Sequence, residues 1–130
     1  MAYSGYHIKL GGNIFPERYI AVETYIITPN QRMDLDSYRD ANGVLHRTVL
    51  SHTASKIEWN TPYLYRTDKV SMMSFLRANM SDVQSRTFSV TYYDDETDAY
   101  KTGRFYMPDI AFQEYATGIY LPTRLALIEY

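Results

Sequence analysis

The sequence predicts a mainly β domain of the α+β class, built as an antiparallel β-sandwich or a partly closed barrel with one flanking helix. Roughly six to eight segments are rich in β-branched and aromatic residues, and most alternate between apolar and polar positions. Most connections between them are short enough for hairpins, and one segment alone has helical periodicity. With 130 residues, 45% of them hydrophobic, the chain has the size of a single domain spanning residues 1–130.

The first third of the chain is expected to hold two strands and a loop. Residues 6–10 form a short strand that ends at Gly11-Gly12-Asn13, a turn cluster. Residues 18–28 alternate and form a long strand that ends at Pro29. Residues 29–37 are polar and aperiodic, which predicts a loop long enough to contact a partner.

The middle of the chain is expected to hold a hairpin, a strand and the helix. Asn42-Gly43 lies between two alternating polar segments, which predicts a type I′ turn in an exposed hairpin. Residues 53–60 alternate again and form a strand that ends before Pro62. The helix is expected over residues 67–80, with Thr67 capping its first turn.

The last third is expected to form a long hairpin and a terminal strand. Residues 85–93 and 99–107 are two strands joined by an acidic connection, and Gly103 marks a β-bulge. Residues 123–130 form a buried strand that reaches the end of the sequence.

Composition excludes several functional classes. A net charge of −2 provides no field that would gather phosphates, so general nucleic-acid binding is disfavoured. The absence of Cys excludes disulfides, Cys-ligated zinc and thiol nucleophiles. No signal peptide and no run of 18 apolar residues is present, so we expect a protein made in a cytoplasm and not inserted in a membrane.

No residue pattern predicts catalysis, a metal site or a cofactor. The spacing of Asp34, Asp36 and Asp40 resembles the start of a calcium loop, but Arg39 and Leu45 occupy its required Gly and Glu positions. The three histidines are scattered, and no phosphate-binding or nucleophile-elbow motif occurs. A small hydrolase or isomerase would need a pocket of converging polar groups.

The chain contains 14 Tyr, an unusually large number. Tyr combines a large apolar ring with a polar hydroxyl, so it suits both partly covered strand faces and surfaces that a partner covers. Composition leaves both explanations open.

The order of features resembles small tail proteins, of the tail-tube or distal-tail kind, from bacteriophages that infect Gram-positive bacteria. The resemblance covers most of the chain from about Ile8 onward. It is carried by short strings at Ile14-Phe15-Pro16, Asn42-Gly43-Val44-Leu45-His46-Arg47, Lys56-Ile57-Glu58-Trp59, Phe88-Ser89-Val90-Thr91-Tyr92-Tyr93, Phe105-Tyr106-Met107 and Leu125-Ala126-Leu127-Ile128-Glu129-Tyr130. Residues 108–122 are extra length relative to a simple tube subunit.

That resemblance implies a non-enzymatic structural protein of the virion tail, assembled in the host cytoplasm. It implies a ring of identical copies, sixfold in the usual case, around a channel that DNA passes through transiently. Other tail or baseplate proteins would be further partners, and the position could be tube, tube terminus or baseplate. The expected interface residues are Asn30, Gln31, Arg32, Met33, Asp34, Tyr38, Tyr92, Tyr93, Tyr100, Tyr115 and Tyr120, and the expected channel-facing acids are Asp94, Asp95, Glu96 and Asp98.

The alternative is a monomeric ligand- or receptor-binding β-sandwich module. In that case Trp59 and neighbouring Tyr would form a platform for the ligand. The two hypotheses differ in an observable way, because one predicts oligomers with projecting arms and the other a monomer with an aromatic cleft.

Overall fold

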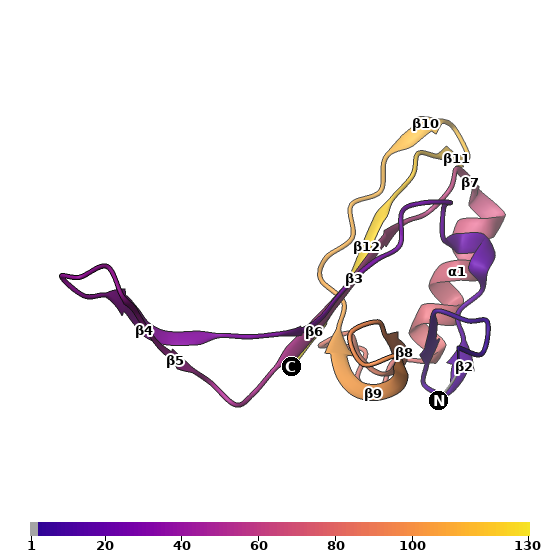
Figure 1. Ribbon diagram of the computed structural model, residues 1–130. Coiled ribbons are helices and arrows are strands. Elements are labelled where there is room, and N and C mark those ends of the chain that lie inside the picture. Colours follow the sequence, from indigo (N-terminus) through magenta and orange to yellow (C-terminus); the bar gives the residue numbers. More distant parts are fainter. Residues whose placement is uncertain (1–2) are drawn as a thin grey trace.

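A computed structural model describes residues 3–130 (Figure 1). The elements are β1 (Ile8–Leu10), β2 (Asn13–Ile14), η1 (Glu17–Tyr19), β3 (Ile26–Gln31), β4 (Asp34–Arg39), β5 (Leu45–Val49), β6 (Ala54–Asn60), β7 (Leu64–Tyr65), α1 (Arg66–Ala78), β8 (Thr87–Asp94), β9 (Ala99–Tyr106), β10 (Glu114–Ala116), β11 (Ile119–Tyr120) and β12 (Arg124–Glu129). The fold is mainly antiparallel β with one helix and open sheets, which confirms the predicted class.

A seven-stranded antiparallel sheet forms the body, in the order β2-β1-β8-β9-β12-β6-β3. Alternation places one face of each central strand in the core, with Ile57 and Trp59 from β6 and Leu125 and Leu127 from β12. Helix α1 adds Met72 and Leu76 to the same cluster. Burial of each such side chain contributes roughly 1.5–3 kcal/mol, so this cluster holds the curved sheet and the helix together.

The prediction of a long strand over residues 18–28 is wrong. Tyr19 is buried at the end of η1, and the chain then turns before β3 begins at Ile26. Thr24 fixes this turn, because its Oγ1 donates to the Ala21 carbonyl at 2.7 Å and accepts from the Asn60 amide at 3.2 Å. Pro29 does not end β3, since β3 is an edge strand with a register shift between Thr28 and Gln31, where a missing N–H is tolerated.

Residues 29–37 are not a loop, because β3 continues to Gln31 and β4 begins at Asp34. The hairpin between β4 and β5 was predicted, but its turn type was not. Among the turn residues only Gly43 has a positive φ, of 80°, and the Gly43 amide bonds to the Asp40 carbonyl. This is the three-residue turn that ends in a left-handed glycine, not a type I′ turn.

Most of the remaining elements were predicted correctly, and two details of them were not. Strand β6, helix α1, the β8–β9 hairpin and the terminal strand β12 occur close to where the sequence placed them. Helix α1 begins after Tyr65 without a side-chain cap, so Thr67 is not the N-cap. Gly103 pairs with Val90 in an unbroken register, so it does not mark a bulge. The extra residues 108–122 contain β10 and β11, which pair with β7 in a small sheet next to α1 (Figure 1).

Candidate assembly surface

The β4–β5 hairpin projects away from the body of the molecule (Figure 1). We call residues 32–50 the arm. Every residue of β4 and β5 is exposed, and among residues 3–130 the two strands hydrogen-bond only to each other as a separate two-stranded sheet. An isolated two-stranded hairpin is only marginally stable in water. Packing against another surface would therefore stabilise the arm.

The two faces of the arm differ in chemistry. Opposed residues of an antiparallel pair share a face, and the register shift between Leu35 and Tyr38 keeps both on one side. This apolar face contains Met33, Leu35, Tyr38, His46, Thr48 and Leu50. Leu35 is 52% exposed and Tyr38 60%, and the Tyr38 ring stacks on His46 at 4.9 Å.

The opposite face carries charged groups. Arg47 donates two hydrogen bonds of 2.8 Å to the Asp34 carboxylate, and these bonds together with one from Ser37 lower the pKa of Asp34. At the tip, where the strands end, a hydrogen bond from His46 of the apolar face lowers the pKa of Asp40. The same carboxylate accepts the Asn42 and Val44 amides, so the turn has a defined shape without help from the body.

A polar cluster at the root connects the arm to the β8–β9 hairpin. Asn30 has a left-handed backbone, with φ of 52°. Its side-chain Nδ2 donates to the Asp94 carboxylate at 2.7 Å and to the Glu96 carboxylate at 2.9 Å. The Lys101 ammonium lies 2.9 Å from the same Asp94 carboxylate. Burial alone would raise the pKa of Asp94, but hydrogen bonds from Lys101 and Asn30 lower it to about 2.

The structure separates the predicted interface residues into three groups. Arg32, Met33, Asp34, Tyr38 and Tyr115 are exposed, and so is Gln31 at the end of β3. Asn30, Tyr93 and Tyr100 are half-buried. Tyr92 and Tyr120 are buried in the core of this chain at 2% and 5% exposure, so including them as surface contacts was wrong.

The four acids predicted to face a channel are not all exposed. Asp95, Glu96 and Asp98 are exposed in the turn between β8 and β9. Asp94 is fully buried and bound by Lys101 and Asn30, so its carboxylate is not on the surface where a channel would meet it. The sequence placed it in the turn, whereas it is the last residue of β8 and points inward.

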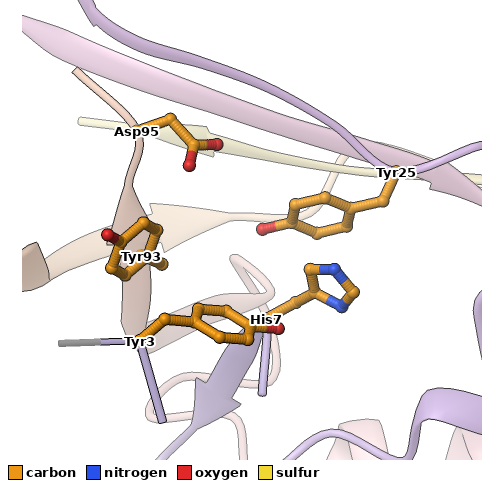
Figure 2. A pocket seen from close by; sticks show the side chains of 5 residues that line it. All are labelled: Tyr3, His7, Tyr25, Tyr93 and Asp95. Atoms are coloured by element: carbon orange, nitrogen blue, oxygen red, sulfur yellow. The ribbon is translucent and has the colours of Figure 1, made fainter. Parts of the chain in front are cut away.

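An aromatic pocket that the sequence did not indicate lies between the N-terminal segment, the residues before β3 and the β8–β9 turn. Figure 2 shows the five side chains that line it, Tyr3, His7, Tyr25, Tyr93 and Asp95. The pocket has a volume of about 340 Å³. No local spacing could have identified it, because its residues come from three distant segments. Trp59, proposed as a ligand platform, is buried instead and packs against Phe15.

Two kinds of feature are absent from residues 3–130. No group of three or more His, Asp or Glu side chains could hold a metal ion. No helix in that range has both the length and the apolar character needed to cross a membrane.

The architecture is thus an open antiparallel sheet with a single helix and a projecting hairpin. A family model described as "Family of unknown function (DUF6711)" matches residues 1–130, so the chain belongs to that family. No curated protein matches the chain. A solved structure described as "Tail of empty GTA particle computed with helical refinement, C6 symmetry" contains a chain with the same fold, with a TM-score of 0.52 and 17% identity over 99% of this chain and 95% of that one.

Proposed function

We propose that this protein is a structural subunit of a phage tail, which assembles with copies of itself into a ring around a DNA channel. One observation carries the proposal: the arm exposes an apolar face that its own body does not cover. Exposed apolar surface of this kind marks an interaction site. A neighbouring copy is the occupant that a ring provides, through a head-to-tail contact that repeats until it closes.

The comparison supports this proposal through the fold alone. The similar chain, by its description, comes from a tail with C6 symmetry, which favours six copies in the ring of the present protein as well. We infer that the ring belongs to the tail of a virion, at a tube, tube-terminus or baseplate position, and that it forms in the host cytoplasm. The exposed acids of the β8–β9 turn would face the channel, where they would repel DNA phosphates and keep the polymer mobile.

The test is the size and shape of the purified protein. Sedimentation velocity and negative-stain images of the chain, alone and with neighbouring tail proteins, are expected to give rings or tubes. A species of 15.2 kDa under all these conditions would contradict the proposal.

The aromatic pocket favours a second candidate function, a monomeric ligand- or receptor-binding module. Its three Tyr rings and its volume suit a small ligand or a side chain. This alternative predicts a monomer that binds ligand without the arm, so a variant lacking the arm would keep its full binding activity. The ring proposal predicts that the same variant loses assembly.

A further inference from the structure

The aromatic pocket has the chemistry of a cation site. The rings of Tyr3 and Tyr93 meet edge to face at 5.3 Å, and His7 lies against Tyr25 with ring centres 4.2 Å apart (Figure 2). Asp95 also lines the space, and no Lys or Arg does. Aromatic faces beside a carboxylate attract cations, and guanidinium in particular because it also stacks on rings.

Electrostatics around Tyr25 agree with this description. Burial raises the pKa of Tyr25, and the nearby carboxylates of Asp95 and Glu17 raise it further. Glu17 is held close by His7, whose Nδ1 lies 2.9 Å from both carboxylate oxygens. Asp95 in the pocket and Glu17 beside it therefore both favour a positively charged group there.

The arm offers one cation that suits the pocket. Of its three arginines, Arg47 is paired with Asp34, and Arg32 bonds to the Asn30 carbonyl and lies 3.9 Å from Glu96. Arg39 ends β4 beside the turn, is exposed, and forms no ion pair within residues 3–130, donating instead to the Gly43 carbonyl at 2.9 Å. The arm projects away from its own body, so its tip is in a position to contact another copy rather than the pocket of its own chain (Figure 1).

We propose that the pocket lined by Tyr3, His7, Tyr25, Tyr93 and Asp95 binds a guanidinium group, and that Arg39 at the arm tip of a neighbouring copy occupies it. This inference rests on the proposed ring assembly. It assigns Asp95 to the contact between subunits, and it leaves Glu96 and Asp98 as the acids available to a channel.

Cross-linking tests the contact directly, because the natural chain contains no Cys. Copies carrying Arg39→Cys are mixed with copies carrying Asp95→Cys and treated with a short bismaleimide. We expect a cross-linked dimer that requires both variants. The matched control pairs Arg39→Cys with Arg77→Cys, an exposed position on α1 that does not line the pocket, and should give little product.

A second measurement uses the concentration at which half of the protein is assembled. Arg39→Gln and Asp95→Asn should each raise this concentration about five- to tenfold, the double variant should add little further, and Arg39→Lys should lose less. Arg77→Gln should change nothing. If the wild-type chain assembles but both Cys pairs cross-link equally, or if the losses of the single variants are additive, the pocket contact alone is overturned. A wild-type chain that never assembles would overturn the proposed function and this inference with it.

Discussion

At the scale of single residues, the buried carboxylate of Asp94 connects three segments of the chain. It accepts hydrogen bonds from Asn30 at the arm root, from Lys101 on β9 and from the Glu96 amide in the acidic turn. A carboxylate removed from water is stable only with such partners, so Asp94 fixes the position of the arm root relative to the body.

Substitution of Asp94 by Asn should lower the free energy of unfolding by about 2 kcal/mol at pH 7, because charge-assisted hydrogen bonds are lost. The pKa of Asp94 is about 2 in the folded state and 3.8 ordinarily. Its stabilisation is therefore complete above about pH 4 and decreases as the pH falls toward 2. Urea unfolding of both proteins at pH 7 and pH 3 should show a smaller difference at pH 3. The exposed Asp98→Asn serves as control, and an equal difference at both pH values would refute this role.

Gly103 does not form a β-bulge, but the absence of a side chain there leaves space for the Glu129 carboxylate. A Cβ at this position would collide with the Glu129 side chain, whose Oε1 accepts the Ser55 amide at 2.8 Å. We expect Gly103→Ala to destabilise the protein by about 1–3 kcal/mol. In a Glu129→Ala background the same substitution should cost much less, since the colliding group is gone. Additive losses in chemical denaturation would show that the two residues are not coupled.

At the scale of elements, the arm is separable from the fold that carries it. Replacing residues 34–49 with a two-residue Asn-Gly turn should leave the urea midpoint of the body nearly unchanged, because β4 and β5 bury no core residue. The same variant should fail to assemble in sedimentation experiments. A body that unfolds without the arm would mean that the arm belongs to the core after all.

The apolar face of the arm should matter more than the charged face. Leu35→Thr preserves strand propensity and removes apolar surface, so it should raise the half-assembly concentration roughly tenfold if that side chain becomes buried. Val49→Thr makes a comparable change on the opposite face, where Val49 pairs with Asp34. Equal effects of the two substitutions would mean that the face of Leu35 is not the main contact of the arm, contrary to this account.

Several elements could be predicted from sequence because local pattern and final environment agree. In β6, alternation places Ile57 and Trp59 in the core, and the β8–β9 hairpin follows the same rule. Residues 18–25 alternate as well, but the burial of Tyr19 and the hydrogen bonds of Thr24 bend them into a turn. Strand β4 contains no β-branched residue, so its local sequence does not indicate a strand. It is a strand because it pairs with β5.

The candidate site was less predictable than the fold. An exposed hairpin at Asn42-Gly43 was predicted, and Tyr38 lies on its apolar face. The pocket could not be found, because Tyr3, Tyr25 and Tyr93 meet only after the sheet curves. Burial of Tyr92 and Tyr120 likewise depends on which face of each strand meets the core, which a Tyr-rich segment does not specify.

At the scale of the whole molecule, the proposed assembly uses two different contact surfaces, the projecting arm and an acidic aromatic pocket next to its root. Two unlike surfaces produce a head-to-tail contact, which closes into a ring or continues as a helical tube. The small sheet of β10, β11 and β7 exposes Tyr65 and Tyr115 at 64% and 70%, and we propose this surface as the contact for a further partner or a stacked ring.

A cryo-electron microscopy reconstruction of the assembled protein tests the central claim most directly. The account predicts a closed ring in which the apolar face of each arm lies against an adjacent copy. A reconstruction with arms extended into solvent, or folded back on their own bodies, would contradict it.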